Sequence, residues 1–425
     1  MVQVEMISLM GGETFSEAIQ RLRRVRGMSY RQLAVASHVD SGYLCKIEKG
    51  VRPCTVEVAH AVDRALDAGG ELVDIARAEH VQRVRSALPF DMVRRRTLMR
   101  WGVTASALAG IGGVGDTTQR VGKVGVADAD RLFQAAVRLR RLGHLHGGES
   151  LWQAAAALVS DSYRMLEQGT YTVAVERRLL RAAGRAHMAA GWLAFDAGRH
   201  DVARTCHNEA LNLARQGADA GTEAHALANL ALQSTRIDRP REAIRLADAA
   251  GRAASQPHGI ARLSAMPHLR RAAACSSMSD ARGADAALGS ARKVLDQDGD
   301  TTTVEWCSFL TPAEVDGLEA TCALELGRAD RAEALLVRAI LGHSDQYARN
   351  RALYRVRLAR ARLDRHEVEG AAEAANAALG DLSGELASWV VSTELDTIAA
   401  RFRSYPEVET VELFLMRYAR QARSR

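Results

Sequence analysis

The chain has 425 residues, of which 47% are hydrophobic and 25% are charged, and these values exclude a disordered protein. Aromatic residues make up only 5% and alanine is frequent, so the composition favours closely packed helices over a β-sandwich. The net charge of +6 permits a polyanionic partner without demonstrating one. We expect an all-α protein of two or three domains, since a domain has about 150 residues.

The sequence predicts a cytoplasmic protein. Its cysteines are scattered without a CxxC pair, and residues 1–12 lack the positive charges of a secretory signal. The Arg95–Arg96 run resembles a twin-arginine export signal, but it lies deep inside the chain, so we expect no export. The apolar stretch 101–115 falls short of the roughly 20 residues that span a membrane, and we expect no membrane partner.

Three zones follow one another along the chain. Residues 1–80 carry short helical patterns that are interrupted by glycine and proline. Residues 81–126 form a junction with eight basic and two acidic side chains, and the second half of the junction reads as a glycine-rich linker. Residues 127–425 alternate long apolar-periodic stretches with short breaks, which predicts pairs of helices.

Four short helices are predicted in the first zone. Ser16 is expected to cap the first helix and Gly27 to end it. Ser29 followed by Gln32 has the spacing of a capping box and opens the second helix.

A tight turn at His38 and Val39 separates the second helix from the third, which Asp40 or Ser41 caps. The fourth helix is expected to begin at Thr55. The side chains expected to face inward are all apolar: Ile19, Leu22, Val25, Leu33, Ala34, Leu44, Ile47, Val58, Ala59, Val62 and Leu66. Two short helices joined by a tight turn and braced on each side predict a helix-turn-helix domain.

This zone resembles the Cro/phage-repressor (XRE) family of helix-turn-helix domains. The resemblance rests on residues 22–29, 32–34, 39–44 and 47–50 with Arg52–Pro53, where caps, loop glycine and core positions fall in register. The sequence departs from the family at His38, where glycine is usual, although histidine tolerates a left-handed backbone better than most residues.

The resemblance implies that the third helix enters the major groove of double-stranded DNA. The side chains at its start and one turn later are then expected to contact base edges: Ser41, Gly42, Tyr43 and Lys46. The neighbouring polar side chains are expected to contact phosphates: Arg31, Gln32, Lys49 and Arg52. The alternative is that these residues form only the solvated face of a helical bundle.

Small residues recur along the third zone. Ala203, Ala243, Ala284, Ala332 and Ala371 are separated by 40, 41, 48 and 39 residues, with further small residues twelve positions before and seven positions after each. Two antiparallel helices need such residues where they cross closely, so the pattern predicts an α-solenoid. It resembles the tetratricopeptide repeat, most clearly around Ala190, Gly191 and Trp192, although its period exceeds the usual 34 residues.

The resemblance implies a concave face lined by the first helix of each pair. The residues projected onto that face are Arg185, Trp192, His225, Asn229, Arg236, Arg270, Arg357 and Arg360. Asparagine there is suited to hold the main chain of an extended peptide and arginines to pair with carboxylates, which favours an acidic peptide. The alternative for each arginine is a solvated position.

Other motifs carry little chemistry. His144 and His146 lie in a glycine-rich stretch with no acid or cysteine at ligand spacing, which predicts a surface turn and no metal site. The chain has no P-loop, no GxGxxG after a strand and no GxSxG elbow, so we expect neither a cofactor nor an enzyme.

An XRE-type domain followed by repeats resembles bacterial regulators whose repeats receive a signalling peptide. The sequence therefore predicts a dimeric transcriptional regulator that binds an operator and senses a peptide or other small effector. The alternative is an interaction scaffold whose repeats recruit a partner protein and whose helix-turn-helix no longer binds DNA.

Overall fold

The computed structural model describes residues 13–50, 52, 54, 56–76, 79, 122–255, 261–296, 307–382 and 386–422. It forms two compact units, residues 1–90 and 91–425. Most of the predicted junction, including the Arg95–Arg96 run, lies outside the described residues. The described residues are mostly helical, with one isolated β-bridge between Lys123 and Thr170, so the all-α prediction is confirmed. None of their helices is long and apolar enough to cross a membrane.

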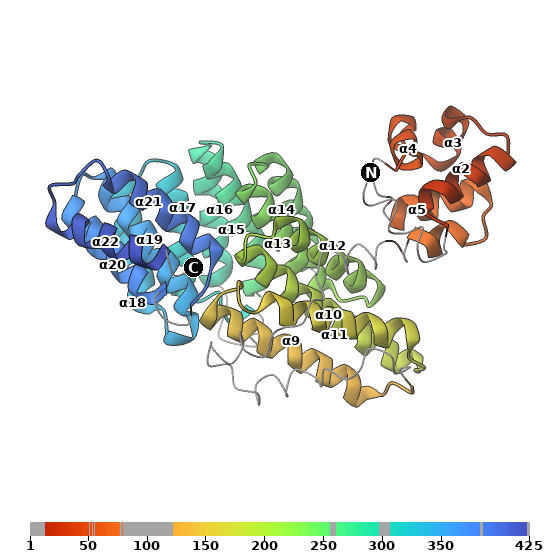
Figure 1. Cartoon of the computed structure of the whole chain (residues 1–425), viewed down its shortest axis with the longest axis horizontal. Helices are drawn as coiled ribbons and strands as arrows, with labels where there is room; N and C mark the ends of the chain where they lie inside the picture. The colour runs from red at the N-terminus through yellow and green to blue at the C-terminus, as the bar shows by residue number, and fades with distance from the viewer. Residues whose placement is uncertain are drawn as a thin grey trace. The chain divides into compact units, whose positions relative to one another are not determined.

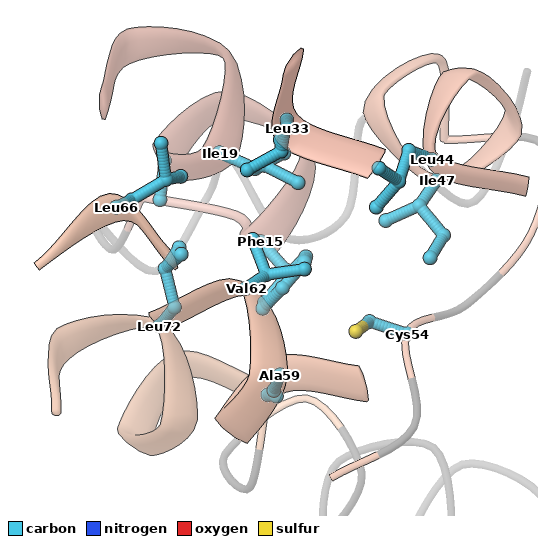
Figure 2. Close-up of a cluster of buried hydrophobic side chains, with 12 residues drawn as sticks. Phe15, Ile19, Leu33, Leu44, Ile47, Cys54, Ala59, Val62, Leu66 and Leu72 are labelled. Carbon is cyan, nitrogen blue, oxygen red and sulfur yellow. The ribbon is translucent and has the colours of Figure 1, made fainter. Parts of the chain in front are cut away.

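The first unit contains α2 (Phe15–Val25), α3 (Tyr30–Ser37), α4 (Ser41–Glu48) and α5 (Val56–Leu66), followed by a short helical segment at 71–76. Figure 2 shows the buried side chains of these helices gathered into one core. Phe15, Leu33, Leu44 and Leu66 are among its fully buried members. The core packs α3 against both α4 and α5, which is the arrangement of a helix-turn-helix domain.

The caps of these helices match most of the sequence expectations. Ser29 and Gln32 form the predicted capping box, and Gly27 has the left-handed φ of 62° that ends a helix. The cap of α2 is Thr14 and not Ser16, whose hydroxyl donates instead to the Glu48 carbonyl at 2.6 Å.

Val25 was wrongly expected in the core. It is the last residue of α2, and its side chain is 76% exposed. The amphipathic pattern of α2 therefore stops one turn before the helix does.

The second unit is an α-solenoid that continues from a helical start, α9 (Val126–His146) and α10 (Trp152–Gln168). Five antiparallel pairs follow: α11 (Val173–Asp196) with α12 (His200–Gln216), α13 (Ala220–Arg236) with α14 (Pro240–Ala254), α15 (Ala261–Ser277) with α16 (Ala281–Asp296), α17 (Pro312–Glu325) with α18 (Ala329–Gly342), and α19 (Ala348–Asp364) with α20 (Val368–Leu382). The short η3 (Asp345–Tyr347) precedes α19, and α21 (Trp389–Phe402) and α22 (Glu409–Ala422) complete the described array. Figure 1 shows this succession from yellow through green to blue.

The recurring small residues lie where the paired helices cross. Ala203, Ala243, Ala284, Ala332 and Ala371 all belong to the second helix of a pair and are fully buried. Their partners twelve residues earlier belong to the first helices and are buried as well. A larger side chain at any of these crossings would force the two helix backbones apart.

The solenoid closes on itself. α9 packs against both α11 and α19, and the His146 carbonyl accepts a hydrogen bond from Ala387 N at 2.8 Å. Gly147 lies at this seam with a φ of 79°, and a Cβ there would stand 2.3 Å from the Ala387 carbonyl oxygen. Only glycine fits such a close approach of two backbones.

The surface turn predicted for His144 and His146 is therefore wrong. Both residues belong to α9, and His144 is only 8% exposed. The glycines that suggested a loose turn are instead required by close packing, because Ala387 lies against Gly147 and the backbone of Leu193 lies against Gly148.

Candidate functional site

The orientation of α4 is fixed locally in the first unit. His38 ends α3 with φ 55° and ψ 31°, in the left-handed conformation that reverses the chain between the two helices. Asp40 then caps α4, because its Oδ1 accepts a hydrogen bond from Tyr43 N at 2.8 Å. Gly42 leaves room for this cap, since a Cβ there would stand only 3.2 Å from Asp40 Oδ1.

The predicted DNA-contacting residues are mostly exposed. Gly42, Lys46 and Lys49 project from α4 or its end, while Ser41 and Tyr43 are half-buried. Arg52 is exposed too, and its guanidinium lies 5.7 Å from the centre of the Tyr43 ring.

Arg31 and Gln32 are exposed at the start of α3. Gln32 Oε1 accepts from Ser29 N at 2.8 Å, so its carbonyl serves the capping box and its amide nitrogen is the group that remains for a phosphate.

One buried ion pair supports α4 and was not foreseen from the sequence. Both Glu48 oxygens accept hydrogen bonds of 2.8 Å from Arg23, on α2, and this arginine also lies over the ring of Tyr30. Burial alone would raise the pKa of Glu48, but the hydrogen bonds from Arg23 and Tyr30 outweigh it and lower that pKa. The pair ties the end of α4 to the core.

A cavity of about 120 Å³ lies inside the second unit. The first helix of every pair contributes to its wall, and α9 forms the opposite side. The aromatic lining residues are Phe133, Trp192, Phe195, Phe309 and Tyr354. The polar and charged lining residues are Arg140, His144, Arg185, His225, Asn229, Arg236, Arg270, Glu314, Arg349, Asn350 and Arg357.

Seven of the eight residues projected onto the concave face line this cavity: Arg185, Trp192, His225, Asn229, Arg236, Arg270 and Arg357. Arg360 does not line it. Its guanidinium pairs with Glu325 at 2.7 Å in an adjoining cleft, which Arg236 and Arg357 also line.

Three of the lining arginines already have carboxylate partners. Arg236 and Arg357 both donate to Glu394, on α21, at 2.7 to 3.0 Å. Burial would raise the pKa of Glu394, but the charges and hydrogen bonds of the two arginines lower it to about 2. Arg349 Nε donates to Asp196 Oδ1 at 2.7 Å, and both side chains of this pair are buried.

Among the lining side chains, Arg270 and His144 have buried polar atoms that make no hydrogen bond to the described residues. Arg270 is 6% exposed, and its Nε makes no hydrogen bond there. Neither ring nitrogen of His144 makes a hydrogen bond there either. Burial and the nearby charges of Arg140 and Arg349 hold the pKa of His144 well below its usual range. Asn229 Nδ2 donates to His207 Nε2 at a long 3.4 Å.

Several lining residues escaped sequence reasoning. Arg140 and His144 were missed because α9 was not recognised as part of the wall. Glu314 and Asn350, which are hydrogen-bonded to each other at 2.8 Å, and Arg349 lie one or more turns from the positions that the repeat pattern singled out. The usable signal is a polar side chain inside an apolar helix stretch, as at Asn229 between Ala228 and Leu230.

A comparison with protein families matches residues 14–75 to one described as a helix-turn-helix domain. The match covers the whole of the α2–α5 bundle and continues into the helical segment at 71–76. It supports a DNA-binding regulatory role for the first unit. A search among curated proteins found no match to the chain.

Proposed function

We propose that the protein is a sequence-specific, DNA-binding transcriptional regulator with α4 as its recognition helix. The observation that carries this proposal is the face of α4 that exposes Gly42 and Lys46, held by the Asp40 cap and the His38 turn within a matched helix-turn-helix domain. A helix presented in this way enters the major groove with its first turn against base edges. Regulation of transcription requires the compartment that holds the DNA, which for a bacterial regulator is the cytoplasm.

Within this proposal, the α4 side chains divide into two groups. Lys46 donates to guanine acceptors, and Ser41 and Tyr43 contact neighbouring bases, with Gly42 allowing close approach of the backbone. Arg31, Gln32, Lys49 and Arg52 contact phosphates and fix the register on the duplex. The cation–π contact with Tyr43 supports this division, because it orders the Arg52 guanidinium beside the helix.

The test begins by enriching an operator from a random duplex library on the full-length protein. We expect Lys46→Ala to weaken operator binding by about 1 to 3 kcal/mol with less loss on random DNA. Arg52→Ala should weaken both by similar factors and flatten the salt dependence. Arg24→Ala, at an exposed position on α2, is the matched control.

Fluorescence anisotropy of labelled duplexes measures all three variants. Unchanged affinity and sequence preference in Lys46→Ala would remove α4 as the recognition helix. Absence of any enriched sequence would favour the interaction scaffold.

We further propose that the second unit is the sensor and that the regulator works as a homodimer. The cavity supports the first part, since its lining combines aromatic walls with a few convergent polar groups, which is typical of ligand sites. The dimer would be supported by an enriched operator with two half-sites about one helical turn apart. Sedimentation should then find two chains per duplex. A single half-site bound by one chain would argue against it.

A further inference from the structure

The closure of the solenoid restricts what its concave face is able to hold. An extended peptide needs an open groove of about 3.3 Å per residue. Here α9 lies against α11 and α19, on the side from which such a peptide would dock. The remaining space of about 120 Å³ far exceeds the roughly 10–15 Å³ that one water needs. The cavity is therefore suited to a compact molecule.

Arg270 points to the charge of that molecule. It lines the cavity from α15, is 6% exposed, and forms no hydrogen bond or ion pair with the described part of the chain. Burial lowers its pKa, and the charges of Glu314 and Tyr354 oppose this effect only in part. A guanidinium buried in this way is unfavourable unless an anion joins it.

The surroundings of Arg270 strengthen the preference for an anion. Burial lowers the pKa of His225, and the charges of Arg140, Arg185 and Arg270 lower it further, so positive groups gather around this neutral ring. Among the described lining residues Glu314 is the only carboxylate, and it already accepts a hydrogen bond from Asn350 at 2.8 Å.

Another part of the lining is built of flat rings, with the guanidinium groups of Arg140 and Arg349 lying 5.4 and 5.5 Å from the ring centres of Phe309 and Trp192. His144 stacks on Phe309 with ring centres 5.9 Å apart, and Trp192 lies 6.3 Å from the same imidazole. A planar apolar group matches such a wall, because ring faces offer a large contact area at a low cost in conformational entropy. A bare inorganic oxyanion would leave this surface uncovered.

We propose that the cavity binds a small aryl carboxylate, with its carboxylate on Arg270 and its ring against the cluster formed by Phe309, His144 and Trp192. This deepens the sensor function proposed above and rests on it. The ligand satisfies the guanidinium that the folded chain leaves without a counter-ion, and the neutral His144 offers a further polar contact beside the ring.

The experiment is calorimetric titration of benzoate, phenylacetate, 1-naphthoate and indole-3-acetate into the full-length protein. The matching primary amides test the charge, and inorganic phosphate tests a bare oxyanion. Arg270→Met is the test variant. Arg271→Met is its control, because Arg271 is adjacent in α15 but partly exposed and paired with Asp248 at 2.6 Å.

We expect at least one carboxylate to bind the wild type and the Arg271→Met protein, with its amide and the Arg270→Met variant at least about tenfold weaker. Without ligand, Arg270→Met should melt at a higher temperature than the wild type, since methionine removes an unpaired buried charge. This combination separates a binding residue from a structural one.

Three binding results would overturn the proposal: equal affinity for acid and amide, phosphate binding as tight as that of the aryl acids, or no binding by any of the four acids at millimolar concentration. Two results for Arg270→Met would overturn it as well: undiminished affinity for the acid, or a melting temperature below that of the wild type. DNA binding is measured separately by anisotropy with and without the acid. An acid that binds without altering operator affinity would leave the cavity assignment intact and remove only the sensor function.

Discussion

The two units of the chain are organised by interactions of very different range. In the first unit the caps join residues three apart, as in Ser29 with Gln32 and Asp40 with Tyr43. In the second unit Asp196 receives hydrogen bonds from Arg349 and Ser388, which are 153 and 192 residues further along the chain. Short-range signals are legible in a single sequence, whereas the pairing of residues so far apart is visible only in the folded solenoid.

The largest effect is expected from breaking the long-range pair. Asp196→Ala leaves Arg349 buried without its partner and also removes the acceptor of Gly148 N and of the Ser388 hydroxyl. Loss of one member of a buried pair costs about 3 to 5 kcal/mol. Urea unfolding followed by circular dichroism measures the loss in the full-length protein.

Asp364→Ala is the control for this variant. Asp364 pairs with Arg401 at 2.7 Å on the surface, where such pairs contribute about 0 to 1 kcal/mol. Equal losses in the two variants would show that closure of the solenoid adds no stability beyond an ordinary surface contact.

Acid should act mainly on the second unit. Burial lowers the pKa of His207 to about 3, and burial with nearby positive charges holds those of His144 and His225 well below their usual range. Unfolding returns these pKa values to about 6.5, so the unfolded chain binds more protons below that pH. The free energy of unfolding is therefore at its full value above pH 6.5. It falls on acidification, by about 2 kcal/mol per histidine at pH 5.

Melting curves between pH 5 and pH 7.5 test this slope. His207→Gln should reduce the dependence of the melting temperature on pH by the contribution of one histidine, whatever the stability of the variant at neutral pH. The described histidines of the first unit, His38 and His60, are exposed. We therefore expect the first unit to unfold at a lower pH than the solenoid. An unchanged dependence of the melting temperature on pH in His207→Gln would contradict the lowered pKa of His207.

The smallest effect is expected at the turn before α4. His38 adopts a left-handed backbone that costs an L-residue about 1 to 2 kcal/mol, and glycine relieves it at some cost in chain entropy. His38→Gly should therefore raise the stability of the first unit by about 0.5 to 1 kcal/mol. His60→Gly, at an exposed position inside α5, should lower it by about 1 kcal/mol. Calorimetry on both variants distinguishes the signs, and destabilisation by both would mean that the His38 side chain does more than occupy the turn.

The first unit was almost wholly predictable from its sequence. Glycine, serine and aspartate at fixed offsets specify turns and caps through their own backbone chemistry, so Gly27 and Ser29 were placed correctly and Asp40 was one of the two caps expected for α4. Ser16 failed as a cap because Thr14, two residues earlier, has the same chemistry and a matching Glu17. Periodicity alone did not separate these two candidates.

The cavity was only partly predictable. The resemblance to the tetratricopeptide repeat projected an inner face on four of the five first helices, and this brought Arg270 and Asn229 into the set of lining residues. It did not predict that α9 would cover that face, since α9 lies outside the repeats. Nor did it predict Glu394 as the partner of Arg236 and Arg357, because that contact depends on the curvature summed over all the pairs.

The seam between Gly147 and Ala387 affects how the chain reaches its folded state. An open solenoid folds as a one-dimensional array in which each repeat needs only its neighbours, and terminal repeats fray independently. Here the hydrogen bonds at the helical start of the second unit are complete only once residues 387 and 388 have docked. Contacts of such high sequence separation slow folding and couple both ends into one cooperative transition. During synthesis the cavity wall therefore stays incomplete until nearly the whole unit has emerged, and a deletion after α19 is expected to loosen α9 at the opposite end of the sequence.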